Sequence, residues 1–286
     1  MFEKSSNGHP LYFALIKWVL IGLVFFIILF FMRQHITRFL TYPAPPVTVP
    51  SPPPEPYEEI YLSLKNQQTV SCWLYKNPIE NTKIIVLMFH GNGENLETMR
   101  MGGLLNSFQN LDIHFLAVDY PGYGNSSGKT SEKANLEAAD AAFKWIKEEF
   151  PDNSVIIFGW SLGAAVAIQA AAKHPGETDA LIAISPWSSL KNVATAHYPQ
   201  FLVNTLLNEK YDSIEAAKNI TSPTLVVHGE RDNIIPVEQG KRVADAIPGK
   251  SKWISIANAG HNDIFSSEAV WDEIKTFLKK LIHRRA

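Results

Sequence analysis

The sequence FGWSLGAA, residues 158–165, places a serine between two glycines, each separated from it by one residue. The residues just before it, SVII, are typical of a buried strand, and the following LGAAVAIQAAAKH is typical of a helix rich in small residues. Ser161 is therefore expected on a sharp strand-to-helix turn, with Gly159 and Gly163 where side chains would collide. Such a turn exposes the serine hydroxyl at the edge of a sheet and points the first amides of the helix toward it.

From Glu58 onward, short apolar runs alternate with helical stretches. Eight runs are rich in β-branched or aromatic residues and are bounded by polar, glycine or proline residues: EIYLSL, TVSCWLY, KIIVLMF, IHFLAVDY, SVIIFGW, ALIAIS, PTLVVHG and KWISI. The first two are expected to pair as a hairpin across KNQQ. The alternation predicts an α/β fold in which a mostly parallel eight-stranded sheet is flanked by helices on both faces.

Candidate partners for the serine follow it in the order acid, then histidine. Asp232 comes after the run PTLVVHG, and His261 comes after KWISI. Because parallel strands end at the same edge of a sheet, these side chains are expected to meet Ser161. We predict that Ser161 is a nucleophile, that His261 is its general base and then acid, and that Asp232 fixes the imidazole tautomer. Glu230 is the alternative acid, and His228 fits the site less well because it lies on another strand.

The motif HGNGEN, residues 90–95, follows the KIIVLMF strand. An oxyanion formed in acyl transfer needs two backbone donors. One is expected from Leu162, directly after the serine, and the other from Asn92, where Gly91 lets the backbone turn inward. A phosphate-binding loop is the competing interpretation, but neither G-x-G-x-x-G nor G-x-x-x-x-G-K-[ST] is present.

Composition narrows the function further. The 286 residues are 46% hydrophobic and carry a formal net charge of −2, which fits a globular domain and gives no general attraction for nucleic acid. The single cysteine, Cys72, is interpreted as a strand residue and excludes an intrachain disulfide or a cysteine-based zinc site. No metal or organic cofactor is expected.

Residues 186–220 form an aromatic-rich and leucine-rich insertion between two strands. Their helical spacing is compatible with a lengthened crossover helix, but we favour a small helical cap over the carboxyl edge of the sheet, where open α/β sheets bind ligands. His197 lies in this insertion and is a candidate substrate contact.

Residues 11–32 form an apolar stretch whose one charge is Lys17. As a helix it would be about 33 Å long, enough to cross a bilayer. A cleaved signal peptide and a buried helix are alternatives, but no small-residue cleavage site follows the run. We therefore expect a short tail (1–10), a single-pass membrane anchor (11–32), a proline-rich linker (33–57) in which residues 42–56 form an extended spacer, and a domain from 58 to 286. Basic residues flank the span evenly, so they favour neither orientation.

Five motifs occur in family order: HGNGEN, DYPGYGNSSG, GWSLGA, HGERDNIIP and AGHND. With them, residues 58–281 resemble the α/β-hydrolase superfamily, in particular membrane-anchored members related to lysophospholipases, monoacylglycerol lipases and protein depalmitoylases. The resemblance implies a serine hydrolase that cleaves a carboxylic ester or thioester through an acyl-enzyme, with a small-molecule or acylated-protein substrate at a lipid bilayer. A serine peptidase or amidase, and a non-catalytic membrane scaffold with a proline-rich docking stalk, are the alternatives.

Overall fold

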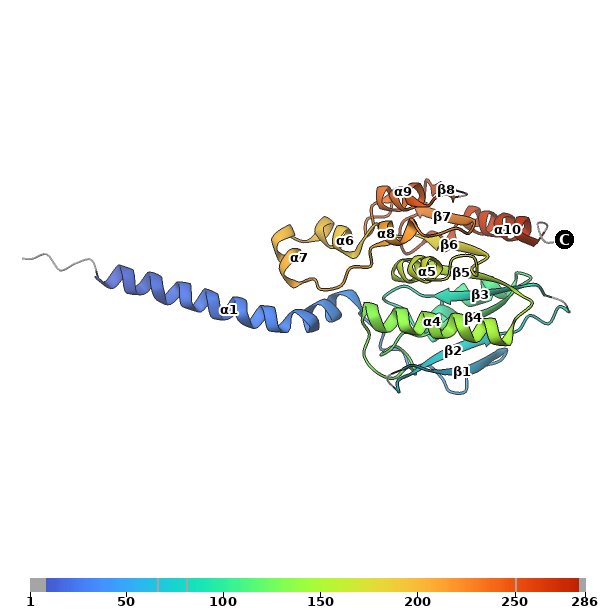
Figure 1. The fold of residues 1–286 in the computed structure, drawn as a ribbon, viewed down its shortest axis with the longest axis horizontal. Helices are drawn as coiled ribbons and strands as arrows, with labels where there is room; N and C mark the ends of the chain where they lie inside the picture. The colour runs from blue at the N-terminus through green and yellow to red at the C-terminus, as the bar shows by residue number, and fades with distance from the viewer. Residues whose placement is uncertain (1–8, 66, 81, 250, 283–286) are drawn as a thin grey trace, which may run out of the picture.

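One central sheet organises the computed structural model, which describes residues 9–65, 67–80, 82–249 and 251–282 (Figure 1). Within these residues the sheet has eight strands: β1 (Tyr57–Ser63), β2 (Thr69–Tyr75), β3 (Ile84–Phe89), β4 (His114–Val118), β5 (Ser154–Trp160), β6 (Ala180–Ile184), β7 (Thr224–Gly229) and β8 (Ser251–Ile256). Their order is β1-β2-β4-β3-β5-β6-β7-β8. Strand β2 runs antiparallel to β1 and β4, and the other pairs are parallel. The mostly parallel sheet and its hairpin are therefore confirmed.

Helices cover both faces of this sheet. One face carries α4 (Glu132–Glu149), α5 (Leu162–Lys173) and α9 (Val237–Ala246), and the other carries α2 (Leu96–Met101), α3 (Leu104–Gln109) and α10 (Glu268–Ile282). Strand β3 shows why its sequence is apolar throughout. Ile85 and Leu87 pack toward α4 and α5, whereas Val86 and Met88 pack toward α2 and α3. A strand covered on both faces has no position left for a polar residue.

The insertion between β6 and β7 contains three helices: α6 (Leu190–His197), α7 (Gln200–Leu206) and α8 (Ser213–Ala217). Helices α6 and α7 project beyond the sheet beside the N-terminal helix (Figure 1). Helix α8 instead packs against α5 and α9, so it belongs to the layer that covers the sheet. Only the first two helices are placed to cover the edge where β5, β7 and β8 end.

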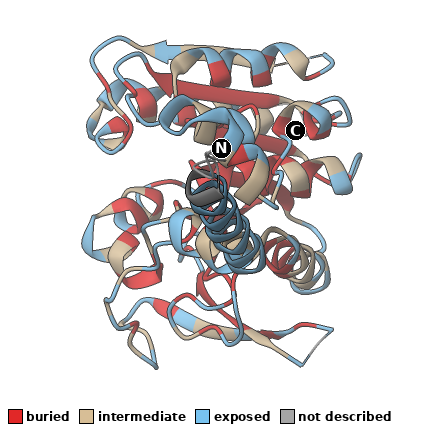
Figure 2. Cartoon of the chain, turned by 90° about the vertical axis from the view of Figure 1, so that its left-hand side faces the viewer, coloured by how far each residue is buried: buried red, intermediate tan, exposed pale blue. Residues whose placement is uncertain are grey.

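The N-terminal helix α1 (His9–Thr41) is long and apolar enough to cross a membrane. Signal sequences near an N-terminus share these properties. Its apolar side chains are exposed over most of its length, as the view along it shows (Figure 2). The helix continues to Thr41, beyond the predicted end at Met32, and its last turns pack on the domain. The predicted tail, residues 1–10, lies outside the described residues except for the two that begin this helix.

The proline-rich segment, residues 42–56, connects α1 to β1 without helix or strand. We predicted an extended spacer, but the segment is packed on the domain. Tyr42 and Val49 are buried, and the Asn95 side-chain amide donates a hydrogen bond to the Val47 carbonyl at 2.7 Å. Apolar side chains interspersed among the prolines supply the surface that holds it there.

Candidate active site

Ser161 occupies the strained turn between β5 and α5. Its backbone has φ 58° and ψ −117°, a conformation that residues other than glycine seldom adopt. The flanking glycines make this turn possible. A Cβ on Gly159 would lie 2.0 Å from the Gly163 carbonyl oxygen, and a Cβ on Gly163 would lie 2.0 Å from that of Phe89. The two glycines therefore allow β3, β5 and the start of α5 to approach one another, and the serine is held at the carboxyl edge of the sheet.

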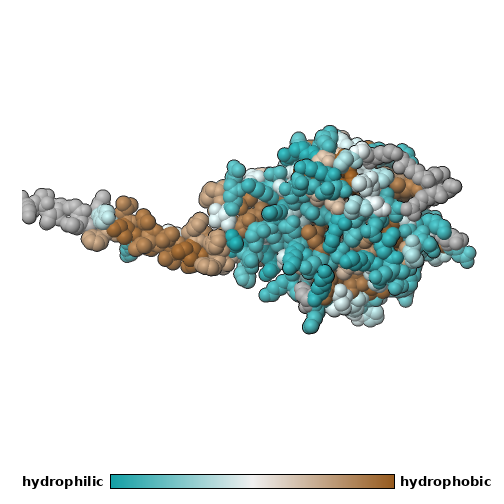
Figure 3. Space-filling view, in the orientation of Figure 1, coloured by the Kyte–Doolittle hydropathy of each residue, from teal (hydrophilic) through white to brown (hydrophobic). Residues whose placement is uncertain are grey.

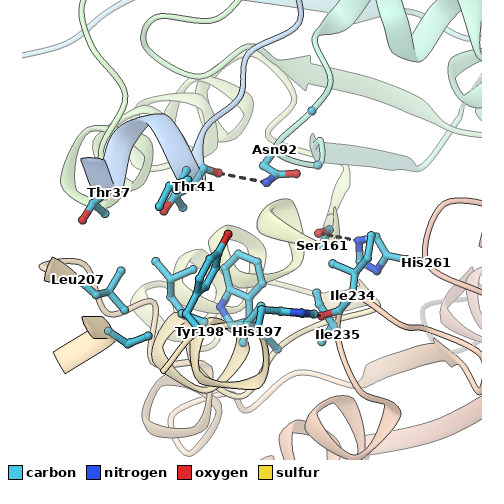
Figure 4. A pocket seen from close by; sticks show the side chains of 18 of the residues that line it. Thr37, Thr41, Asn92, Ser161, His197, Tyr198, Leu207, Ile234, Ile235 and His261 are labelled. Atoms are coloured by element: carbon cyan, nitrogen blue, oxygen red, sulfur yellow. Dashed lines mark hydrogen bonds between the residues drawn. The ribbon is translucent and has the colours of Figure 1, made fainter. Parts of the chain in front are cut away.

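Three buried side chains form a hydrogen-bonded chain at this edge, and Figure 4 shows two of them, Ser161 and His261. His261 Nε2 lies 3.0 Å from Ser161 Oγ, and His261 Nδ1 lies 2.6 Å from Asp232 Oδ2. With Nδ1 protonated, the imidazole donates to the carboxylate and accepts the serine proton. The three residues follow β5, β7 and β8, so the structure brings together the residues that the sequence order singled out.

Asp232 is held in place by several donors. Its Oδ1 accepts hydrogen bonds from the backbone N–H groups of Ile234 at 2.9 Å and Ile235 at 2.7 Å. Its Oδ2 lies 3.2 Å from Nε2 of the buried His228. Burial acts to raise the pKa of Asp232, but the hydrogen bonds from His228 and His261 outweigh it and hold that pKa below its ordinary value.

His228 is the residue that sequence reasoning missed. It is the second-last residue of β7, and its Nε2 lies close to the carboxylate of the residue four positions later in the same motif, HGERD. His228 lies on a different strand from the one that precedes His261. It still contacts Asp232, because the loop after β7 turns back over the end of that strand. By contrast, the alternative acid Glu230 is exposed and accepts a hydrogen bond from the Ser255 hydroxyl at 2.7 Å.

A cavity of about 560 Å³ opens above Ser161 and His261. Most of its walls are apolar. These residues come from α1, from the end of β5, from the insertion that contains α6 and α7, and from the loop after β7: Ile36, Leu40, Trp160, Trp187, Leu190, Val193, Ala194, Leu202, Val203, Leu206, Leu207, Ile234 and Ile235. This size is in the range of sites that bind small organic ligands. The cavity leads directly to the serine hydroxyl.

The HGNGEN loop forms one wall near the serine. Asn92 lines the cavity, its carbonyl accepts a hydrogen bond from the Tyr123 hydroxyl at 2.8 Å, and its side-chain amide donates to the Thr41 carbonyl at 3.2 Å. Leu162 is the first residue of α5. Glu94 also lines the cavity, and burial raises the pKa of its carboxyl.

His197 lines the cavity from α6, as the substrate-contact prediction requires. Its Nε2 lies 2.8 Å from the Ile234 carbonyl, which connects α6 to the loop that carries Asp232. Figure 4 shows the His197 ring beside Ile234.

Comparisons with known proteins agree with this architecture. Residues 80–216 match a family model described as serine aminopeptidase, S33, and residues 204–282 match one described as TAP-like protein. An uncharacterised protein of Mycobacterium tuberculosis, MT2364, is 30% identical over 224 residues, which cover 77% of this chain and 78% of that protein. The esterase Pf2001 of Pyrococcus furiosus has a similar structure, with a TM-score of 0.63, 20% identity and coverage of 80% of this chain and 90% of the esterase. The chain belongs to the α/β-hydrolase superfamily.

This α/β-hydrolase is a hydrolytic enzyme. A third relative carries a more specific name. Lysophosphatidylserine lipase ABHD12 of Macaca fascicularis is 28% identical over 204 residues, which cover 65% of this chain and 51% of that protein. The chain therefore matches about half the length of the lipase.

Proposed function

We propose that the chain is a membrane-anchored serine hydrolase that cleaves a carboxylic ester or thioester of an acyl-chain substrate. The observation that carries the proposal is the hydrogen-bonded chain Ser161–His261–Asp232 at the floor of an apolar cavity. In this proposal α1 is the anchor, the domain from residue 58 onward is catalytic, and residues 186–220 form the cap.

The geometry supports acyl transfer in two steps. His261 Nε2 takes the Ser161 proton as Oγ attacks the substrate carbonyl carbon, and the oxyanion accepts hydrogen bonds from the Leu162 and Asn92 amides. His261 then protonates the leaving oxygen or sulfur, and the acyl-enzyme remains. Water, deprotonated by His261, attacks the acyl carbon and releases the carboxylic acid and the free serine. Asp232, ionised at neutral pH, stabilises the imidazolium that forms twice in this cycle.

The cavity walls and α1 support an acyl-chain substrate. An apolar cavity removes a hydrocarbon chain from water, at a gain of about 0.8 kcal/mol for each buried CH₂. The exposed apolar side chains of α1, such as Trp18 and Phe25, are stable in a bilayer rather than in water. The name of the relative from Macaca fascicularis favours a lysophospholipid among such substrates.

Covalent labelling tests the proposal. The full chain in detergent is treated with a fluorophosphonate probe, which reacts with activated serines. We expect labelling of the wild-type protein, and we expect Ser161→Ala and His261→Ala to lose it. Ser107→Ala is the matched control, since Ser107 lies on α3 with its hydroxyl bonded to the Gly103 carbonyl. Labelling that persists in Ser161→Ala would contradict the assignment. An aminoacyl amide hydrolysed faster than a long-chain ester would favour a peptidase instead.

A further inference from the structure

The last two turns of α1 form a wall of the cavity. Ile36, Thr37, Leu40 and Thr41 all line it, and their spacing places them on one face of the helix. Figure 4 shows Thr37 and Thr41 on the side of the cavity away from His261. The helix that would lie in a bilayer along most of its length therefore ends as part of the substrate site.

Helix α7 lies beside this end of α1. The Thr37 hydroxyl donates to the Leu206 carbonyl at 3.0 Å, and Leu202 and Leu206 of α7 line the cavity with Ile36 and Leu40 of α1. Within the cap, α7 extends furthest along α1 (Figure 1). The two helices thus flank the part of the cavity that is nearest to the apolar length of α1.

Exposed apolar side chains, here called the rim, lie next in sequence to cavity-lining residues of α1 and α7 or line the cavity themselves: Phe39 precedes Leu40, Phe201 precedes Leu202, and Tyr198 is part of the lining. Phe39, Tyr198 and Phe201 are 79%, 51% and 67% exposed, although large apolar side chains are usually covered. In Figure 3 the hydrophobic surface of α1 continues onto the end of the domain beside it. Grouped apolar residues next to a membrane helix fit a lipid surface, in which they are covered by acyl chains.

A buried polar cluster fixes α1 in this position. The Tyr42 hydroxyl, directly after the helix, donates to the Glu209 carboxylate and lies 3.1 Å from the Tyr211 hydroxyl, while Arg38 Nε donates to the Thr130 carbonyl at 3.0 Å. These contacts connect the end of α1 both to the end of the cap insertion and to the loop before α4. A simple tether would need none of them.

We propose that the end of α1 and helix α7 form a lateral entrance through which an acyl chain passes from the bilayer to Ser161, with Ile36 and Leu40 contacting the chain. The proposal rests on the proposed function, and it adds that α1 binds substrate as well as the membrane. It also places the rim residues Phe39, Tyr198 and Phe201 in the lipid surface.

The first experiment places larger side chains at the two positions of α1 that are proposed to contact the acyl chain. The full chain is reconstituted in phosphatidylcholine vesicles, and kcat/KM is measured for p-nitrophenyl palmitate and p-nitrophenyl acetate per fluorophosphonate-labelled site. In Ile36→Trp and Leu40→Trp the palmitate-to-acetate ratio should fall about tenfold, the scale of steric discrimination in an apolar pocket. In His35→Trp, at an exposed position of the same helix outside the cavity lining, the ratio should remain within about twofold of wild type.

The second experiment tests where the chain comes from. A charge in the rim, Phe201→Asp, should lower palmitate hydrolysis in vesicles about tenfold, because a carboxylate is expensive to seat among acyl chains. Its matched control is Ile79→Asp, since Ile79 is also exposed but lies in the loop before β3, at the opposite edge of the sheet.

The outcomes separate this proposal from the proposed function. An unchanged ratio in labelled Leu40→Trp, an equal fall in His35→Trp, or an equal loss in Ile79→Asp would overturn the lateral entrance. Leu40 is half exposed, so its variant keeps the test valid if Ile36→Trp does not fold. Failure of wild type to label, or labelling of Ser161→Ala, would instead overturn the proposed function.

Discussion

Two regions of the molecule differ in how they are packed. One is the edge of the sheet that holds Ser161, Asp232 and His261, the proposed catalytic edge. The other is the end of the domain where α1 meets α6 and α7, here called the anchor–cap end. Every residue of β5 is buried, and so are nine of the twelve residues of α5. Helices α6 and α7 each bury a single residue, Leu190 and Val203. Densely packed elements hold side chains to narrow positions, whereas sparsely packed ones can be displaced at low cost. The proposed function would thus place the chemistry in the rigid part of the molecule and substrate selection in the part that tolerates change.

Two carboxylates show the same difference. Asp232, at the catalytic edge, has a lowered pKa because hydrogen bonds from two histidines outweigh its burial. Glu209, where the cap meets α1, has a raised pKa because burial outweighs its hydrogen bonds, Tyr42 providing the largest of these. The surroundings of Asp232 therefore favour its ionised form, whereas those of Glu209 disfavour its ionised form.

The largest effect that tests this comparison is expected at Asp232. In Asp232→Asn the imidazole of His261 loses the carboxylate that fixes its tautomer and stabilises its charged form, so kcat should fall about 10⁴-fold. Steady-state hydrolysis of a p-nitrophenyl ester measures the loss. The matched control is Glu230→Gln, two residues earlier and exposed, which should change kcat less than about twofold. Equal losses in both variants would show that the loop, rather than the carboxylate, is needed.

The next effect concerns the turn itself. Gly163→Ala places a Cβ against the Phe89 carbonyl in a region that cannot relax, so we expect a loss of about 4 kcal/mol or more in the free energy of unfolding. Gly93→Ala is the control, because a Cβ there meets no atom within 4 Å. Denaturant unfolding of both variants checks the difference. A Gly163→Ala protein as stable as wild type would show that the catalytic edge is less rigid than its packing indicates.

The sequence predicts the catalytic edge better than it predicts the anchor–cap end. The eight strands and the meeting of Ser161, Asp232 and His261 could be predicted because each depends on local pattern and on parallel strands ending together. The role of His228 was missed since it arises from the path of a loop rather than from spacing. The packing of residues 42–56 was missed too, because prolines predict a local backbone shape but not the surface on which it lies.

The arrangement of the anchor–cap end could not be predicted from the sequence, because it depends on contacts between residues far apart in the chain. Nothing in the local pattern of residues 33–41 distinguishes a helix that leaves the membrane from one that lines a cavity. The cluster of Tyr42, Glu209 and Tyr211 joins residues 169 positions apart, and no periodicity reports such a contact. Long-range polar contacts of this kind are individually weak, so a sequence carries little trace of them.

The smallest effect is expected at Glu209. Its folded pKa is raised, so the folded state binds this proton more tightly than the unfolded chain does, and stability from this group falls as pH rises from the ordinary value of about 4.3 through the folded pKa. Glu209→Gln removes that titration. The variant should match wild type near pH 4.5 and be more stable at pH 8 by at most about 1 kcal/mol. Thermal unfolding in detergent over this pH range measures it.

Glu215→Gln is the control for this measurement, since Glu215 is exposed on α8 and pairs with Lys218. It should show no comparable divergence between the two pH values. A Glu209→Gln protein less stable than wild type at pH 8 would mean that the Tyr42 hydroxyl and the Glu132 amide stabilise the carboxylate more than burial penalises it. In that case the junction of α1 with the cap would be built to keep a charge, as the catalytic edge is, and the contrast between the two regions would be one of packing alone.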